Sequence, residues 1–539
     1  MELQDTDCMA SQIPVQSTGY FSDLITDYLN EDEFLRPFYS YRLNDEGLLQ
    51  AIANRKQFST QRALLVEVIQ EQYKDLALPA PVQTNIELLK KENTFTVTSA
   101  HQPNLMTGYL YFFYKIIHSV KLAAHLKAIA PDYHFVPVFY IGAEDNDFEE
   151  LGHFRYAGRV FEWQTKQTGA VGMMQADEAL QALIKELMPL LGPEGYHEQK
   201  LKEVIRQAYA PGNTIAQAKR IFINEFLGAM GIVVLDANDA RLKASFSSII
   251  HQEIFEPKAY DLVQGYSQLL QLRYKAQAFA RPINLFYLKE GIRERIIATE
   301  SGFSVNNTDI VWDTKQMQQE IAEHPERFSP NVILRGLYQE YILPNVAFIG
   351  GGSEVAYWMQ LKAVFEHYQI PFPVLVLRQS VLIMNQKTAE KQQLLGFSDQ
   401  KIFSKTKVLI DELVQQSREE EWQLTAYTEQ LSSWEDELQL KLGNLDKNLN
   451  TSVKAAITKM KQQIEVLDKK IQRSIKTKMA VSIARIQDFK AHSFPNDSLQ
   501  ERYETFMPYY LSYGPALFEQ LRKHTDPFGK QFLILKFNS

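Results

Sequence analysis

The sequence predicts an α/β fold with a parallel sheet, followed by a long helical segment. Near-continuous apolar runs, which suit strands buried on both faces of a sheet, alternate with helical segments. These runs are FTVTSA (95–100), HFVPVFYIGA (134–143), GIVVLDAND (231–239), NVAFIGGG (345–352) and PFPVLVL (371–377). From about residue 390 the composition shifts to Gln, Lys and Glu. Apolar residues then recur at steps of three and four, which is typical of paired helices.

Helical segments precede and separate these strands. Residues 17–90 carry Leu, Ile and Phe at mixed spacings of three and four, with acidic or amide residues between them. LYFFYKIIHSVKLAAHLKAIA (110–130) is predicted as the helix after the first strand, and Pro131 ends it. ARLKASFSSIIHQEI (240–254) follows the third strand in the same way. The alternation is what a parallel sheet with crossover helices requires.

Composition limits the class of protein. With 539 residues the chain is too long for one compact core, and 45% apolar with 23% charged residues is ordinary for a globular protein. The net charge of −8 argues against nucleic acid as a main partner. One cysteine, Cys8, lies in a polar N-terminal stretch that shows no folding pattern, so disulfides and zinc sites with several thiolates are excluded. We expect a cytoplasmic protein without a signal peptide or a membrane span.

The domain organisation follows from these shifts in pattern. We expect an N-terminal helical segment packed on the core (1–92), a core (93–388) with insertions near 155–225 and 280–330, a helical coiled-coil domain (389–490), and a C-terminal segment that returns to the core (491–539). The second insertion opens with a hairpin-like pair, INLFYLKEGIRERII. Gly443 and Asn444 interrupt the helical stretch, so a coiled coil, an antiparallel pair of shorter helices and an ordinary helical bundle all remain open.

Polar side chains cluster first in TSAHQPNLMTG (98–108), where a buried strand gives way to a helix that we expect to begin near Thr107. Open α/β sheets bind ligands at the carboxyl ends of their strands, and helix N-termini favour anions there. His101, Gln102, Asn104 and Thr107 are therefore candidates for ligand contact. The structural alternative is that Asn104 and Thr107 merely cap the helix.

The next strand ends at an acidic run, EDNDFEE, from Glu144 to Glu150. So many carboxylates repel one another unless a positive group lies among them, such as a substrate ammonium, Mg²⁺ or arginines from elsewhere. Glu144, Asp145 and Asp147 are the candidates for that role, whereas the last two glutamates are expected to begin the following segment. The alternative is a solvated acidic loop.

A third strand end carries FIGGGSEVAYW (348–358). Gly350, Gly351 and Gly352 allow close backbone approach or positive φ, and Ser353 is expected to cap the next helix. Glu354 and Tyr357 belong to the same predicted binding wall. The run is neither a Walker A loop nor a GxGxxG fingerprint, so by itself it is a weak nucleotide signal.

Arginines supply the positive charge for anion binding. FSPNVILRGLYQEY predicts a helix with Ser329 as N-cap and Pro330 in its first turn, and this helix carries Arg335. Arg378 follows the last predicted strand. We expect Arg335 and Arg378 to be anion anchors, and a structural ion pair is the alternative for Arg335. The sequence shows no paired-histidine or paired-cysteine metal motif and no GxSxG elbow.

These stretches together resemble one family. TSAHQPNLMTGYLYFFYK, VPVFYIGAEDNDFEE, FSPNVILRGLYQEYILPNVAFIGGGSEVAYW, IPFPVLVLRQS and HSFPNDSLQER occur in order over nearly the whole chain. They are similar to the serial signatures of the bacillithiol biosynthesis cysteine-adding enzymes, the cysteine ligases known as BshC.

The resemblance implies a Rossmann-like core of the nucleotidyltransferase type, interrupted by connecting insertions, and a C-terminal coiled coil that helps to form a homodimer. It implies a ligase that joins the carboxyl of L-cysteine to the free amine of glucosaminyl-malate, the last step that gives bacillithiol. It also implies binding of adenine nucleotide (ATP or ADP), with Mg²⁺ as a further candidate. A zinc site for the cysteine thiol is not expected, because the chain has one cysteine.

The resemblance bears on the catalytic candidates, His101, Glu144, Asp145 and Asp147. The family often has Gln at the position of His101, and Gln cannot accept a proton as a base, so His101 is expected to orient substrate by hydrogen bonds. The acidic loop of the family usually reads Glu-Asp-His-Asp, and here Asn146 replaces the His. Carboxyl activation and thiol recognition are left open. The competing functions are a nucleotidyltransferase that acts on a small acid and a non-catalytic nucleotide-binding coiled-coil scaffold.

Overall fold

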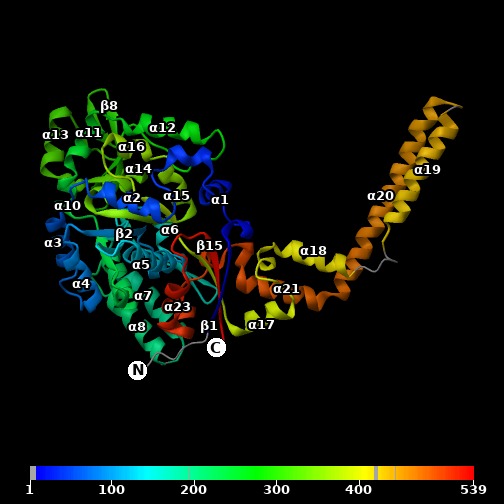
Figure 1. Ribbon diagram of the computed structural model, residues 1–539, viewed down its shortest axis with the longest axis horizontal. Coiled ribbons are helices and arrows are strands. Elements are labelled where there is room, and N and C mark those ends of the chain that lie inside the picture. Colours follow the sequence, from blue (N-terminus) through cyan, green and yellow to red (C-terminus); the bar gives the residue numbers. More distant parts are fainter. Residues whose placement is uncertain (1–7, 194, 418–422, 444, 539) are drawn as a thin grey trace. The chain divides into compact units, whose positions relative to one another are not determined.

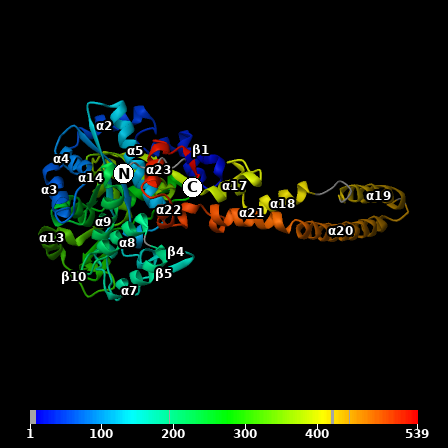
Figure 2. The same ribbon diagram turned by 90° about the horizontal axis from the view of Figure 1, so that it is seen from below.

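The computed structural model describes residues 8–193, 195–417, 423–443 and 445–538 (Figures 1 and 2). The chain divides into two compact units, one formed by residues 1–383 with 499–539 and the other by residues 384–498. No helix in the described part of the chain is both long and apolar enough to cross a membrane.

The first unit contains the predicted parallel sheet. Its strands lie in the order β13-β12-β2-β3-β6, and every pair is parallel. The strands are β2 (Thr94–His101), β3 (His134–Ile141), β6 (Val233–Asp236), β12 (Asn345–Gly350) and β13 (Val374–Leu377). Nearly all their side chains are buried, as the continuous apolar runs predicted. The α/β, Rossmann-like fold class is confirmed, and all five strands end at one edge of the sheet.

Helices cover this sheet and place residues at its edge. The helix α5 (Tyr111–Ile129) packs against β2 and β3, while α14 (Val332–Ile342) precedes β12 and α15 (Gly352–Met359) follows it. The N-terminal helices are α1 (Asp23–Leu29), α2 (Asp45–Arg55), α3 (Arg62–Gln72) and α4 (Ala80–Leu88). Tyr28 of α1 donates a hydrogen bond of 2.6 Å to the Leu375 carbonyl, which fixes α1 to the core.

The two insertions carry their own small sheets. The segment between β3 and β6, which includes the first predicted insertion near 155–225, contains α6 (Phe148–Leu151), β4 (His153–Tyr156), β5 (Arg159–Glu162), α7 (Glu178–Leu187), α8 (Tyr196–Ala208) and α9 (Ile215–Leu227). After β6 come α10 (Ala240–Ser245), α11 (Ser247–Phe255) and α12 (Ala259–Leu270). The second insertion contains β7 (Leu285–Lys289), β8 (Ile292–Thr299), β9 (Gly302–Val305), β10 (Val311–Trp312), α13 (Thr314–Glu323) and β11 (Phe328–Pro330). The strands β7 and β8 are antiparallel, so the predicted hairpin is confirmed.

The end of the chain returns to this unit. The helix α16 (Lys362–His367) precedes β13, and the strand β14 (Ser380–Met384) follows it. Beyond residue 498 come α22 (Met507–Tyr513), α23 (Ala516–His524) and β15 (Gln531–Phe537). The strand β15 pairs with β14 and with β1 (Cys8–Pro14). The interpretation of the stretch around Cys8 as unfolded is therefore wrong, because its backbone is part of a three-stranded sheet.

Two predicted helix starts are wrong. The helix α5 begins at Tyr111 and not near Thr107, because residues 106–108 have positive φ, which no α-helix accepts. Ser329 and Pro330 are buried in β11, and the N-cap of α14 is Asn331. The Asn331 side chain accepts a hydrogen bond of 2.8 Å from the Ile333 amide. Asparagine is as good a cap as serine, so residue type alone did not distinguish Ser329 from Asn331, two positions later.

The second unit is helical. It contains α17 (Gln386–Leu394), α18 (Thr406–Gln416), α19 (Thr425–Gly443), α20 (Lys447–Lys478) and α21 (Ala480–Ser493). Figures 1 and 2 both show α19 and α20 side by side, and Glu435 of α19 pairs with Lys461 of α20 at 3.0 Å. The helices α19 and α20 form an antiparallel pair, a form that a predicted coiled coil can take; Asn444, at the predicted interruption, lies outside the described residues.

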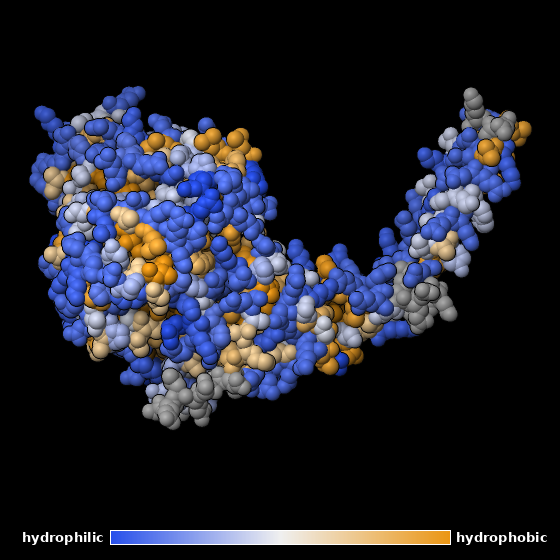
Figure 3. All heavy atoms as spheres, in the orientation of Figure 1, coloured by the Kyte–Doolittle hydropathy of each residue, from blue (hydrophilic) through white to orange (hydrophobic). Residues whose placement is uncertain are grey.

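The α19–α20 pair buries only part of its apolar seam. Leu431 and Ile457 are 7% and 3% exposed, whereas Trp434 and Met460 remain 55% and 51% exposed. Figure 3 shows apolar side chains between hydrophilic ones on this pair. A two-helix layer has too little depth to bury a full apolar stripe, so the exposed side chains are available to another surface.

Candidate functional site

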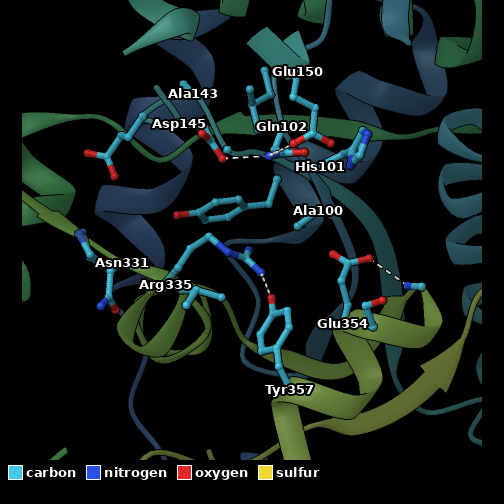
Figure 4. A pocket seen from close by; sticks show the side chains of 18 of the residues that line it. Ala100, His101, Gln102, Ala143, Asp145, Glu150, Asn331, Arg335, Glu354 and Tyr357 are labelled. Carbon is cyan, nitrogen blue, oxygen red and sulfur yellow. Dashed lines mark hydrogen bonds between the residues drawn. The ribbon is translucent and has the colours of Figure 1, made fainter. Parts of the chain in front are cut away.

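A cavity of about 740 Å³ lies at the edge of the sheet where the parallel strands end (Figure 4). Its walls come from the turns after β2, β3 and β12, from α14 and α15, and from the second insertion. This position is the usual ligand site of an open α/β sheet.

The structure brings most of the predicted site residues together in this cavity. Those that line it are His101, Gln102, Glu144, Asp145, Arg335, Gly351, Gly352, Ser353, Glu354, Tyr357 and Arg378. Four others do not line it: Asn104, Thr107, Asp147 and Gly350. Asn104, Thr107 and Gly350 are buried, whereas Asp147 is an exposed residue at the start of α6.

The loop after β2 is held in an unusual backbone conformation. Met106, Thr107 and Gly108 have φ of 47°, 67° and 75°, a region that non-glycine residues rarely adopt. Buried groups hold this loop from behind: Lys219 donates to the Asn104 carbonyl at 3.0 Å, and the Met106 amide donates to the Tyr209 hydroxyl at 2.7 Å.

The capping alternative for this loop is wrong. The N-cap of α5 is Leu110, and no side chain caps that helix end. Asn104 and Thr107 are both buried, and the Asn104 Oδ1 and Thr107 Oγ1 atoms find no hydrogen-bond partner among the described residues. The loop is therefore not built to start the helix, and its polar residues serve the shape of the turn that presents His101 and Gln102.

His101 is held as a neutral imidazole. Burial, followed by the nearby charges of Lys115 and Lys219, lowers the pKa of His101 well below its usual range. Its ring lies edge-on to Tyr111, with 5.3 Å between the ring centroids. The Nε2 atom is buried and has no hydrogen-bond partner in the described parts of the chain. A neutral ring nitrogen in this position can donate or accept one hydrogen bond, according to its tautomer.

The carboxylates of the acidic run have partners inside the protein. Glu144 forms an ion pair with Lys243, a fully buried lysine that also donates to the Phe328 carbonyl at 2.9 Å. Gln102 donates to Asp145 Oδ2 at 2.9 Å. Asp147 accepts from the Glu150 amide at 3.2 Å and is the N-cap of α6. Lys243 therefore supplies a positive charge that offsets the repulsion among the carboxylates of the acidic run.

Asn146, in the middle of that run, fixes an arginine of the second insertion. Arg293 Nη1 donates to Asn146 Oδ1 at 3.0 Å, and Asn146 Nδ2 donates back to the Arg293 carbonyl at 3.1 Å. Arg293 Nε also donates to the Ser329 hydroxyl at 3.1 Å. Arg293 lines the cavity together with Arg281 and Arg295, so this insertion supplies one of its basic walls.

The glycine run packs closely and does not use positive φ. Gly350 ends β12, Gly351 is the N-cap of α15, and none of the three glycines has positive φ. A Cβ on Gly350 would lie 2.9 Å from Phe348 Cε1, so close packing is the reason for glycine there. Glu354 caps α15 by accepting from the Gly351 amide at 2.8 Å, and it also pairs with the buried Lys115. The prediction that Ser353 caps this helix is wrong.

The arginines opposite the acidic run have few carboxylate partners. Arg335 Nη2 donates to the Tyr357 hydroxyl at 2.6 Å, as Figure 4 shows, and no described carboxylate forms an ion pair with Arg335. The structural ion-pair alternative for Arg335 therefore finds no support. Arg378 pairs with Glu501 at 2.7 Å.

Basic groups outnumber acidic groups in the cavity lining. The seven basic residues are Lys115, Arg281, Arg293, Arg295, Arg335, Arg378 and Arg502, and the four acidic residues are Glu144, Asp145, Glu150 and Glu354. Two of the four carboxylates are already paired with buried lysines. Over the parts of the chain that the structure describes, no group of three or more His, Cys, Asp and Glu side chains is arranged to hold a metal ion. The cavity is suited to a ligand with several anionic groups and at least one polar or cationic group.

Comparison with protein families covers both units. Residues 9–379 match the family model described as the N-terminal Rossmann-like domain of bacillithiol biosynthesis BshC. Residues 381–537 match its C-terminal coiled-coil domain. The chain belongs to the BshC family. This family is one of ligases in bacillithiol biosynthesis, so the resemblance of the sequence motifs is confirmed.

Curated relatives of this BshC-family chain span its whole length. A protein of Flavobacterium johnsoniae is 36% identical, with 98% of this chain and 99% of the relative covered. Proteins of Flavobacterium psychrophilum (34%, with 98% and 99% covered) and Christiangramia forsetii (36%, with 97% and 98% covered) follow. Each is named "Putative cysteine ligase BshC".

Several lining residues of this BshC-family site were not predicted as site residues. Arg293 and Arg295 lie within the predicted hairpin, and Arg502 lies within the motif HSFPNDSLQER, so their segments were noted but their roles were not. Lys115 ends the motif TSAHQPNLMTGYLYFFYK without having been assigned a role, and Lys243, which pairs with the lining residue Glu144, lies in α10 outside the quoted motifs. Only the fold brings these side chains to the strand ends, because each comes from a separate part of the chain.

Proposed function

We propose that this BshC-family chain joins the carboxyl of L-cysteine to the amine of glucosaminyl-malate. The observation that supports it most is the composition of the cavity, in which seven basic and four acidic residues surround about 740 Å³ at the strand ends. Both proposed substrates carry carboxylates, and each carries one amine. A cavity with an excess of arginine and a smaller acidic side matches that combination of groups.

The two sides of the cavity divide the work of binding. Arg335, Arg378 and Arg502 hold substrate carboxylates by charge-assisted hydrogen bonds. Asp145 and Glu150, on the acidic side, hold the cysteine ammonium. Orientation of this kind accounts for a large part of the rate in reactions that join two bound molecules.

The bond-forming step needs a neutral amine next to an activated carboxyl. The amine nitrogen attacks the carbon of the activated carboxyl, and a C–N bond forms. The C–O bond to the activating group breaks, that group leaves with the electron pair, and the amine nitrogen releases its proton to water. His101, kept neutral by its lowered pKa, accepts a hydrogen bond from the amine and directs its lone pair towards the carbon. This role needs a hydrogen-bond acceptor and no proton transfer.

Adenine nucleotide is the proposed co-substrate. Arg281, Arg293 and Arg295, which the second insertion supplies to the cavity lining, have the chemistry to hold phosphate oxygens, with Mg²⁺ as the accompanying ion. When bound, the nucleotide supplies a leaving group for the carboxyl oxygen. The fit rests on these basic side chains, since the cavity lining holds no motif for the adenine ring.

We infer in addition that the α19–α20 pair forms a homodimer contact. Leu438 and Leu467 are 39% and 50% exposed on its apolar side, and burying a leucine is worth about 1.5–3 kcal/mol. The double substitution Leu438→Asp with Leu467→Asp is expected to shift the protein to a monomer. Light scattering of the variant measures this; an unchanged mass equal to that of a wild-type dimer would remove the helical pair from the interface.

The decisive experiment for the reaction is an incubation of the pure protein with L-cysteine and glucosaminyl-malate, with and without ATP. Mass spectrometry of the products is expected to show the amide. Pyrophosphate release without an amide would instead indicate a nucleotidyltransferase that acts on a small acid. Nucleotide binding without any product would indicate a scaffold.

A further inference from the structure

The C-terminal segment brings a fully buried carboxylate to the back of the cavity. Glu501 lies in the turn Gln500–Arg502, where the chain re-enters the first unit after residue 498, and its side chain is 0% exposed. A buried glutamate is stable only when donors surround its oxygens. The neighbours of Glu501 therefore show what it does.

The two carboxylate oxygens of Glu501 have different partners. Oε1 accepts from Arg378 Nη2 at 2.7 Å and from the Ser380 hydroxyl at 3.0 Å. Oε2 accepts from the Val381 amide at 3.0 Å. One oxygen thus holds the guanidinium, and the other fixes the turn to the backbone of β14.

Arg378 is the link between Glu501 and the cavity. Its side chain is 6% exposed, and its guanidinium carbon lies 5.0 Å from the centroid of the Tyr111 ring, which packs against His101. Nη1 is held by the Gln379 carbonyl at 3.1 Å. Without Glu501 the buried, charged guanidinium of Arg378 would have only neutral hydrogen-bond acceptors among the described residues, which is unfavourable. We expect it then to turn towards solvent or towards another carboxylate of the cavity.

Attachment of the turn does not need the pairing with Arg378. Gln500, the preceding residue, accepts from the Ile383 amide at 3.0 Å and donates to the Ile383 carbonyl at 2.9 Å. These two hydrogen bonds and the one between Glu501 and the Val381 amide attach the turn to the backbone of β14. The ion pair of Glu501 is therefore additional to what the fold requires.

We propose that Glu501 is a positioning residue of the site, which acts on the ligand only through Arg378. Its carboxylate holds the guanidinium in the pose that binds an anionic group of the substrate. The proposal rests on the proposed function in one respect, namely that Arg378 is an anion anchor.

The substitution Glu501→Gln separates the two roles. The amide oxygen of Gln can still accept from the Val381 amide, but its NH2 group then faces the guanidinium, donor against donor. The turn is kept and the hold on Arg378 is lost. Gln500→Ala is the matched control, because Gln500 is a buried neighbour in the same turn and forms hydrogen bonds with the Ile383 backbone of the same strand.

The test is calorimetric titration of the full chain with sodium L-malate as the anionic probe. Glu501→Gln is expected to raise Kd at least about tenfold, and Arg378→Gln at least as much. The double variant should bind no more weakly than Arg378→Gln alone, since Glu501 has no other route to the probe. Gln500→Ala is expected to lower Tm but to leave Kd within about twofold.

Several outcomes would overturn the proposal. They are an unchanged Kd in Glu501→Gln, an equal loss in Gln500→Ala, additive losses in the double variant, and no binding of L-malate by the wild type. Should Glu501→Gln fail to fold, Glu501→Asp takes its place; it keeps the charge but withdraws it from Arg378, and an unchanged Kd there also overturns the proposal. If the wild type makes no amide but the expected pattern of malate binding holds, the reaction is wrong and the positioning role stands.

Discussion

The acidic and the basic sides of the cavity differ in how their charges are balanced. On the acidic side, Glu144 is neutralised by Lys243, and Asp145 accepts from Gln102. On the basic side, the hydrogen-bond partners of Arg335 among the described residues are the Tyr357 hydroxyl at 2.6 Å and the Gln339 amide oxygen at 3.5 Å. The acidic run was predicted from the sequence to need a positive ligand group, but its carboxylates have more partners within the protein than Arg335 has.

This difference indicates which side of the cavity contributes more to the binding of a charged ligand. A carboxylate that is already paired with a buried cation attracts a cationic ligand group only weakly, because the cation largely cancels the negative charge of the carboxylate. A guanidinium paired only with neutral oxygens still attracts an anion. We therefore expect some substitutions on the acidic side to destabilise the fold and others to lower activity without destabilising it.

The largest effect is expected at Lys243. Lys243→Met removes the counter-ion of Glu144, whose side chain is only 14% exposed. Removing one partner of a buried ion pair destabilises a protein by about 3–5 kcal/mol. Urea unfolding of the variant measures the loss. Adding Glu144→Gln to the same chain should recover most of it, since the unpaired charge is then gone. A loss of less than about 1 kcal/mol in Lys243→Met would show that the pair does not stabilise the acidic side.

The next effect is expected at His101, between the two sides. His101→Gln should keep product formation within about tenfold, equivalent to about 1.4 kcal/mol of barrier, because Gln offers a hydrogen-bond acceptor in a similar place. His101→Ala should lose about 10²-fold or more. Rates of amide formation, measured at saturating substrates, compare the two. Equal and severe losses would restore His101 as a general base, whose removal costs about 10²–10⁴-fold.

A smaller effect separates two neighbours of the acidic run. Asp145 lines the cavity, whereas Asp147 caps α6 away from it. Asp145→Asn should lower product formation by about 10- to 100-fold, at the level of a lost charge-assisted hydrogen bond, and barely change Tm. Asp147→Asn should keep both, because Asn caps a helix as well as Asp does. An inactive Asp147→Asn would place the ligand on the outer part of the run.

The sequence predicted the fold better than the partners within the site. The five strands could be predicted because each is a continuous apolar run, and the residues at their ends met in one cavity because parallel strands end at one edge. The errors were local. Ser329, Ser353 and Thr107 were assigned as caps or helix starts, although the observed N-caps are Asn331, Gly351 and Leu110. These errors of two or three positions are smaller than a pattern of residue types can resolve.

The remaining site residues could not be predicted for a different reason. Lys243 meets Glu144 from 99 positions away, and Glu501 meets Arg378 from 123 positions away. Neither lysine nor glutamate stands out in a helix or a polar turn, since most such residues face solvent. Only the folded chain shows that these two are buried, and burial is what makes their pairing necessary.

The smallest effect is expected at Glu253, a buried residue whose hydrogen bonds hold Asn284 next to the basic side of the cavity. Glu253 accepts from the Asn284 amide at 2.8 Å and from its side chain at 2.9 Å, and Asn284 in turn holds the Arg281 backbone and the Asn331 cap. Burial raises the pKa of Glu253 from 4.5 to about 6.

The folded state therefore favours the protonated carboxyl of Glu253. Its contribution to stability is full below pH 4.5 and is lost as the pH rises through about 6. Glu253→Gln keeps the acceptor for Asn284 and cannot ionise, so it should gain about 1 kcal/mol over the wild type at pH 5.5 relative to pH 4. Unfolding free energies of both proteins between pH 4 and 7 measure this. Parallel curves would mean that Glu253 does not titrate in this window and that the basic side rests on an ionised support.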